Sequence, residues 1–255
     1  SRRRQRQMCI RDRTSFADLV FNPVAQVKFI HTVAAGYVAG AMFVMGISSY
    51  YLLKGRDLAF AKRSFSVAAG FGLAAILSVI VLGDESGYEL GDVQKTKLAA
   101  IEGEWETHEP PAGFNLIGFP DQEAEETRGG IKIPYVMGLI ATRSLDEEVT
   151  GLKEIMHENE ARIRSGMVAY EYLQRLRNGE KTEANIAMFE EHKADLGYGL
   201  LLKAYTPNVV DATDEQIGLA VKQSIPPVAP LFWSFRIMVA AGFSLLFIIA
   251  MGFYY

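Results

Sequence analysis

Three long stretches with almost no charged residues constrain the fold of this chain more than any other feature of its sequence. They lie at Phe29–Leu53, Phe65–Leu82 and about Pro230–Tyr255. A helix crosses the hydrocarbon core of a bilayer with about 20 apolar residues, so we expect three transmembrane helices. The alternative is three buried core helices of a large soluble protein, although uncharged helical stretches of this length are rare outside membranes.

The region between the second and third stretches, residues 84–226, is polar and charged. Loops of this length usually carry their own structure or function. Apolar spacing and sequence character predict helices over 91–106, 151–177 and about 182–195. Residues 107–135, rich in Pro, Gly and Glu, are expected to be irregular or mobile. The predicted fold class is therefore all-α: a fragment of an integral membrane helix bundle with a large helical extracytoplasmic loop.

Local signals refine this division of the chain. Thr213, followed three residues later by Gln216, predicts a helix N-cap. We expect a transmembrane hairpin over 14–83, the loop over 84–226 and a last transmembrane helix over 227–255.

Basic residues set the expected orientation in the membrane. The short loop at 54–63 carries four lysines or arginines, and the positive-inside rule places it in the cytoplasm. Residues 84–226 then lie outside, in the periplasm. Residues 1–13 contain six arginines on that same outer side and lack the apolar region of a signal peptide. We therefore expect 1–13 to be foreign to the natural protein, and disordered.

Composition excludes several function classes. The formal net charge is −4, carried mostly by the polar middle region, so nothing indicates nucleic-acid binding. Cys9 is the single cysteine, which excludes an internal disulfide, a cysteine-based zinc site and an iron–sulfur cluster. His108, His157 and His192 have no metal-ligand spacing and are interpreted as surface residues.

Three residues inside the apolar stretches are candidates for a cofactor site. An intramembrane histidine such as His31 needs a partner, either a haem iron or a hydrogen bond to a neighbouring helix. A lone methionine such as Met238 is usually packing, but with His31 it would complete a His/Met axial pair that holds low-spin haem. Arg236 needs a counter-charge, either a haem propionate or a carboxylate from a helix outside this chain.

Long strings of this chain resemble subunit I of the cytochrome bd quinol oxidases. They are NPVAQVKFIHTVAAGYVAGAMF at 22–43, LKGRDLAFAKRSF at 53–65, LSVIVLGDESGYELGDVQKTKLAAIEGEWET at 77–107, DLGYGLLLKAYTPNV at 195–209 and APLFWSFRIMVAAGF at 229–243. The resemblance covers residues 14–255, and 84–226 is similar to the long version of the family's Q-loop. The spans resemble the fifth, sixth and seventh helices of that subunit.

The resemblance implies roles for five residues. His31 and Met238 would be the axial ligands of the low-spin haem b, with Arg236 beside it. Lys97 and Glu102, in GDVQKTKLAAIE, would belong to the quinol-oxidation site. Chemically, a carboxylate can accept a quinol proton and a lysine can hydrogen-bond a quinol oxygen. From spacing alone, Lys97 and Glu102 read as an ordinary solvated helix face.

The resemblance also implies a respiratory ubiquinol oxidase of the bacterial inner membrane. Its second subunit, quinol and membrane lipid would be the partners. The high-spin haem b and haem d that reduce oxygen would be held by helices outside this chain, so the fragment would not be active alone. The rival hypothesis is a non-enzymatic membrane sensor with a folded extracytoplasmic domain. It explains the hydropathy, but not His31 with Met238, nor Arg236 inside a span.

Overall fold

The computed structural model describes residues 16–141, 143–144 and 146–255, and it divides into two compact units. The first contains the chain up to Glu89 together with Ile237–Tyr255, and the second contains Leu90–Arg236. Each unit is described by itself. The predicted foreign segment, residues 1–13, lies outside the described residues.

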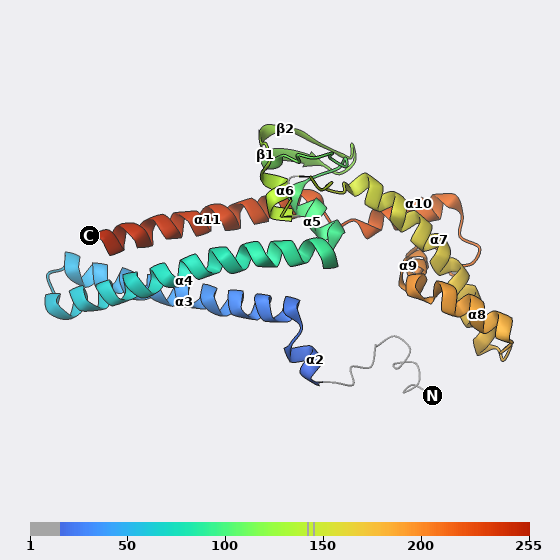
Figure 1. Cartoon of the computed structure of the whole chain (residues 1–255), viewed down its shortest axis with the longest axis horizontal. Coiled ribbons are helices and arrows are strands. Elements are labelled where there is room, and N and C mark those ends of the chain that lie inside the picture. Colours follow the sequence, from blue (N-terminus) through green and yellow to red (C-terminus); the bar gives the residue numbers. More distant parts are fainter. Residues whose placement is uncertain (1–15, 142, 145) are drawn as a thin grey trace. The chain divides into compact units, whose positions relative to one another are not determined.

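Long helices form the first unit (Figure 1). The long helices are α3 (Pro23–Leu53), most of α4 (Leu58–Val93) and most of α11 (Val228–Tyr254), and the short α2 (Phe16–Val20) precedes them. The start of α3 follows from its sequence: the Asn22 side chain accepts a hydrogen bond from the Ala25 amide (3.0 Å), and Pro23 occupies the first turn. Close packing of α3 on α4 depends on Gly72, where an added Cβ would lie 2.9 Å from that of Ala41.

The three long apolar helices agree with the predicted membrane spans. Each is long and apolar enough to cross a membrane. Large apolar side chains such as Phe29 (70% exposed), Phe43 (69%) and Phe247 (67%) point away from the unit's core, so much of the apolar surface of the helices is not buried within the unit. This agrees with a membrane bundle and disagrees with the alternative of buried core helices. The connection between α3 and α4 is shorter than predicted, because α4 already begins at Leu58.

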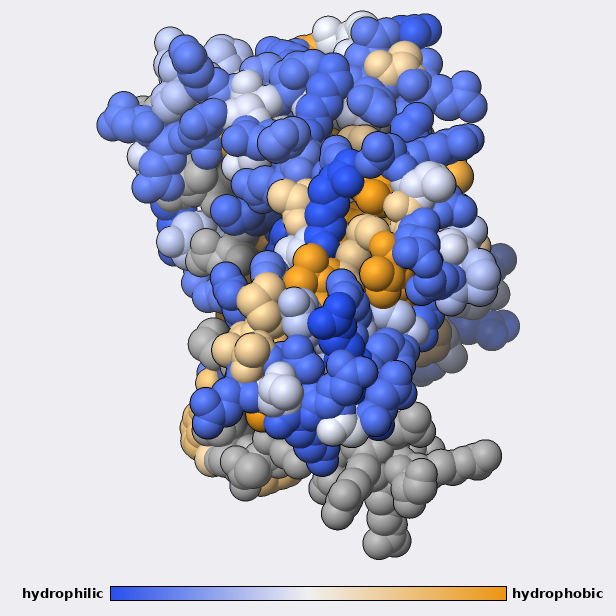
Figure 2. Space-filling view, turned by 90° about the vertical axis from the view of Figure 1, so that its right-hand side faces the viewer, coloured by the Kyte–Doolittle hydropathy of each residue, from blue (hydrophilic) through white to orange (hydrophobic). Residues whose placement is uncertain are grey.

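The second unit combines the long helix α7 with shorter helices and a hairpin (Figure 1). In chain order it contains α5 (Lys95–Glu102), β1 (Phe114–Asp121), β2 (Glu126–Ile133), α6 (Val136–Ala141), α7 (Leu152–Arg177), α8 (Glu183–His192), η1 (Lys193–Asp195), α9 (Leu196–Gly199), η2 (Leu200–Ala204) and α10 (Asp214–Ser224). Helices α7 and α8 match their predicted ranges, and Thr213 with Gln216 forms a reciprocal capping box at α10. The face shown in Figure 2 is mostly hydrophilic.

Two expectations for this region are wrong. Residues 107–135 are not irregular throughout, because β1 and β2 pair there as an antiparallel hairpin. Gly130 allows the two strands of that hairpin to lie close together, because a Cβ at this position would lie 2.0 Å from the Ile117 carbonyl oxygen. The predicted helix over 91–106 is two helices, since α4 runs to Val93 and α5 ends before Gly103, whose φ is +64°.

Helix α7 carries a glycine whose replacement should destabilise the second unit. A Cβ on Gly166 would lie 2.3 Å from the Asp195 carbonyl oxygen and 2.4 Å from the Gly199 amide nitrogen, both backbone atoms. We expect Gly166→Ala to destabilise the fold by at least the ~1–3 kcal/mol typical of overpacking, read as a lower melting temperature of the detergent-solubilised full-length protein. Gly218→Ala on α10 is the matched control, because no atom lies within 4 Å of its added Cβ. Equal melting temperatures for the two variants would contradict this packing.

Candidate functional site

His31 lies in α3 with its ring partly buried against α4. A Cβ added at Gly83 would lie 3.4 Å from His31 Cε1, so the absence of a side chain at Gly83 makes room for the imidazole. Within the described part of the chain, His31 Nδ1 is buried and has no hydrogen-bond partner. The described residues therefore do not supply the hydrogen bond to a neighbouring helix that was the alternative role for this side chain.

Met238 lies in α11, in the same compact unit as His31. Met238 is 56% exposed, like other apolar residues of this unit, so its thioether is accessible. An imidazole with an unpartnered buried nitrogen and an accessible thioether are donor types that hold low-spin haem iron. The two residues thus fit the group that the sequence predicts, on burial and chemistry.

Arg236, at the border of the second unit, is fixed by residues of this chain. Its Nη2 donates to Glu102 Oε2 at 2.8 Å, and Nε and Nη2 donate to the Asn115 carbonyl oxygen at 3.2 and 2.6 Å. Nη1 donates to the Ile101 carbonyl oxygen, and the guanidinium lies 3.7 Å from the centroid of the Phe232 ring. The sequence suggested that a haem propionate or a carboxylate from a helix outside this chain would balance the charge of Arg236. The carboxylate found here belongs to this chain and comes from α5.

Glu102 ends α5 and is almost fully buried, with 1% of its surface exposed. Burial raises its pKa to about 7, although the charge and hydrogen bond of Arg236 lower it and the charge of Glu104 raises it. A carboxyl that titrates near neutral pH can both accept and release a proton, as acid–base catalysis requires.

Lys97 does not join Glu102 in this arrangement. Lys97 is exposed, whereas Glu102 is buried, as expected for two residues about 140° apart around a helix. A substrate that contacts both would have to lie against the edge of α5 and reach from its exposed to its buried side.

Sequence reasoning missed three polar residues beside Glu102. Asn115, on β1, donates through Nδ2 to the Glu102 carbonyl oxygen (3.2 Å) and to Glu104 Oε1 (2.8 Å). Glu104 is 2% exposed, and its Oε2 lies 2.8 Å from Nε2 of His108, a histidine predicted to be a surface residue. The one available signal was the polar Asn115 within the otherwise apolar start of β1. Its contacts with Glu102 and Glu104 join residues 13 and 11 positions apart, which no local pattern predicts.

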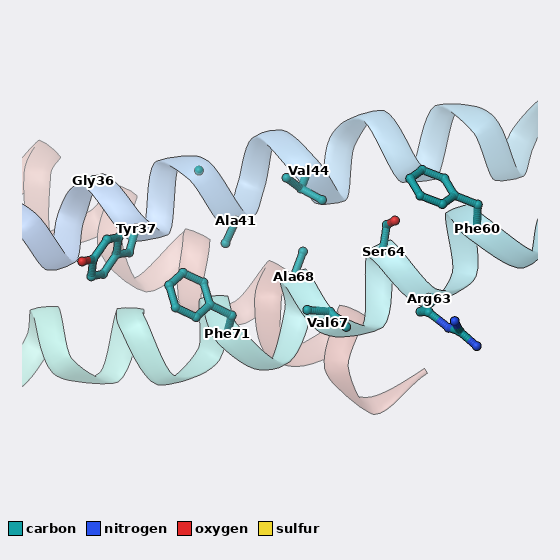
Figure 3. Close-up of a pocket in the computed structure, with 11 residues that line it drawn as sticks. Gly36, Tyr37, Ala41, Val44, Phe60, Arg63, Ser64, Val67, Ala68 and Phe71 are labelled. Atoms are coloured by element: carbon teal, nitrogen blue, oxygen red, sulfur yellow. The ribbon is translucent and has the colours of Figure 1, made fainter.

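A hollow lies between α3 and α4 (Figure 3). It measures about 550 Å³, and Tyr37 and Phe71 lie next to each other in its lining, with ring centroids 5.5 Å apart. Arg63 is the one charged side chain in its lining. This lining offers no carboxylate that could take up a proton.

The comparisons with known proteins indicate one family. The family model described as "Cytochrome bd terminal oxidase subunit I" matches residues 3–255, which extends further towards the N-terminus than the strings quoted above. The chain is 48% identical over 235 residues to cytochrome bd-II ubiquinol oxidase subunit 1 of Escherichia coli (strain K12), covering 92% of this chain and 46% of that protein.

Two more distant similarities were found. Cytochrome bd ubiquinol oxidase subunit 1 of Bacillus subtilis (strain 168) is 28% identical over 227 residues, covering 89% of this chain and 36% of that protein. The solved bd oxidase of Geobacillus thermodenitrificans matches with a TM-score of 0.49 and 19% identity, covering 92% of this chain and 60% of that one. The chain therefore spans less than half the length of the two relatives compared by sequence.

Proposed function

Because the chain belongs to the cytochrome bd terminal oxidase subunit I family, we propose that it forms the electron-entry part of a respiratory quinol:oxygen oxidoreductase. In this proposal quinol is oxidised beside α5, and its electrons are delivered to a low-spin haem b held by His31 and Met238. Family membership also argues against the rival hypothesis of a membrane sensor.

The buried ion pair between Arg236 and Glu102 carries the proposal. It ties the end of α5 to α11 two residues before Met238. A proton acceptor is thereby held beside the helix that bears a proposed haem ligand. Arg236 also limits how far burial can raise the pKa of Glu102, because its charge favours the carboxylate.

Within the site each side chain has a separate task. Glu102 accepts a proton from the quinol hydroxyl as the electrons leave, and Lys97, on the exposed side of α5, donates a hydrogen bond to a quinol oxygen. His31 and Met238 would hold the haem, and Arg236 would lie beside it with one N–H of its five not used in the bonds above. When bound, the haem supplies one-electron redox chemistry, which none of these side chains can provide.

The rest of the enzyme completes the proposed reaction. Parts of the subunit outside this chain would hold a high-spin haem b and haem d, which would supply the chemistry that reduces oxygen to water, and a second subunit would be the partner. We place the protein in the bacterial inner membrane, with 54–63 cytoplasmic and 84–226 periplasmic, so that quinol protons leave on the outer side. The basic residues at 54–63 support this orientation.

The proposed role of Glu102 predicts a pH dependence. Its pKa is raised to about 7 by burial, so the carboxyl is mostly protonated at pH 6 and mostly ionised at pH 8. Only the ionised form can accept a proton, and we expect quinol oxidation by the full-length oxidase to rise by about tenfold between these pH values. Steady-state oxygen consumption with saturating quinol measures this. A flat profile from pH 6 to 8 would contradict the assignment.

The raised pKa of Glu102 also makes the stability of the fold depend on pH, in the direction opposite to that of activity. A carboxyl whose pKa is raised in the folded state binds its proton more tightly there than in the unfolded chain. The stability that Glu102 contributes is therefore full below its ordinary value of 4.5 and is lost as the pH rises towards 7. Activity and stability should change in opposite directions over this range.

A further inference from the structure

A second buried carboxylate lies two residues after Glu102 and has no task in the function proposed above. Glu104 is 2% exposed, yet both of its oxygens are engaged by polar groups. Oε1 accepts from the Asn115 amide at 2.8 Å, and Oε2 lies 2.8 Å from His108 Nε2. Burying a carboxylate costs free energy unless it is paired and hydrogen-bonded, so this arrangement calls for a function.

These contacts connect the buried interior with the surface. Asn115 joins the two ends of the network, because its carbonyl oxygen accepts from Arg236 while its amide bonds the Glu102 carbonyl oxygen and Glu104. At the other end, the His108 side chain is 38% exposed, compared with 3% for the side chain of Glu104. The polar contacts therefore run from Arg236 and the backbone carbonyl of Glu102, through Asn115 and Glu104, to an imidazole ring that water can reach.

A polar cavity adjoins the outer end of this network. It measures about 280 Å³ and is lined by Glu104, His108 and Asn115 together with Lys132, Lys153 and Trp105. Its size exceeds the roughly 30 Å³ that one water occupies in the liquid. In the described part of the chain, the buried Trp105 indole N–H has no protein partner.

We propose that Glu104 and His108 are proton-relay residues that carry the proton taken up by Glu102 to the aqueous phase. The inference rests on the proposed role of Glu102. In each cycle the Glu102 carboxyl gives its proton to the Glu104 carboxylate, Glu104 protonates the His108 imidazole, and the imidazolium releases the proton to water. Glu102 is then again a carboxylate, ready for the next quinol.

Electrostatics favour such an exchange. One guanidinium, Arg236, faces both carboxyls, while Lys132 from β2 and His108 also act on Glu104. Two neighbouring carboxylates repel each other, so protonation of one favours ionisation of the other. Burial raises the pKa of Glu104, against the charges of Lys132, His108 and Arg236.

The test uses Glu104→Gln and His108→Ala in the full-length oxidase. Glu104→Gln keeps an acceptor for Asn115 but cannot carry a proton, and we expect a loss of kcat of about 10- to 100-fold with unchanged haem spectrum and KM. His108→Ala should lower kcat several-fold in weakly buffered solution, and added imidazole should restore it. His157→Ala, an exposed histidine on α7, is the matched control and should behave as the unmodified enzyme.

A rate equal to that of the unmodified enzyme in either relay variant overturns the relay. A loss in His108→Ala that imidazole does not restore also overturns it, because that loss would be structural. Glu102→Gln separates this failure from that of the proposed function. If Glu102→Gln is inactive while both relay variants are fully active, only the relay is wrong; a fully active Glu102→Gln would refute the role of Glu102 itself.

Discussion

His31→Ala and Met238→Leu, each made in the complete subunit, are expected to abolish the low-spin haem signal in the reduced-minus-oxidised visible spectrum. Low-spin haem needs a strong donor on both axial sides, and neither alanine nor leucine has one. Replacing Met238 should cost little packing, because its side chain is 56% exposed. The signals of the other haems should remain.

Two variants of the same residue types serve as controls. Met251→Leu changes another partly exposed methionine on α11, and His157→Ala changes an exposed histidine on α7. Both should retain the full low-spin spectrum. An unchanged low-spin spectrum in both His31→Ala and Met238→Leu would show that the ligands lie elsewhere.

Glu102→Gln is expected to lower quinol oxidation by about 100-fold or more while the low-spin haem remains bound. General-base groups contribute about 10²- to 10⁴-fold to a rate, and an amide cannot take up the proton. Glutamine still offers an oxygen to Arg236, which also keeps its bonds to the Asn115 and Ile101 carbonyl oxygens. The haem side of the site should therefore be preserved.

The control for this variant is Glu106→Gln. Glu106 has a 65% exposed side chain and pairs with Lys153, so its loss should leave the quinol rate unchanged. A surface ion pair of this kind contributes at most about 1 kcal/mol to stability. Equal quinol rates in Glu102→Gln and the unmodified oxidase would remove Glu102 from the mechanism.

Helices were predictable from the sequence where they depend on local patterns. Apolar length alone indicated α3, α4 and α11, and the apolar periodicity over 151–177 indicated α7. The β1–β2 hairpin was missed, because Pro, Gly and Glu in 107–135 suggested irregular structure. Its glycines instead permit close contact between the strands, and pairing partners across a hairpin are not visible in local composition.

The candidate site was predictable only in part. The types of His31 and Arg236 and their places in apolar stretches marked them as unusual. Met238 became a candidate only in combination with His31, and Lys97 and Glu102 gained weight only through the family resemblance. The bond between Arg236 and Glu102 spans 134 positions, and no local pattern predicts a contact at that separation.

The network beyond Glu102 is also a product of tertiary structure. Glu104 and His108 are four residues apart, but they lie after the end of α5, where helical spacing gives no guidance. Asn115 reaches both from β1, a strand that was not predicted. His108 was therefore predicted to be a surface residue from its polar neighbours in the sequence, although its ring contacts the buried carboxylate of Glu104.

The most direct test of the central claim is to mix the full-length oxidase with quinol under anaerobic conditions. Reduction of the low-spin haem is then monitored by its visible spectrum. The claim is that electrons enter from quinol beside Glu102 and reach the haem held by His31 and Met238. In the unmodified enzyme, we predict that quinol reduces this haem as completely as dithionite does. In Glu102→Gln, dithionite should reduce it fully, whereas reduction by quinol should be slower by about 100-fold or more. Equally fast reduction by quinol in both enzymes would contradict the claim.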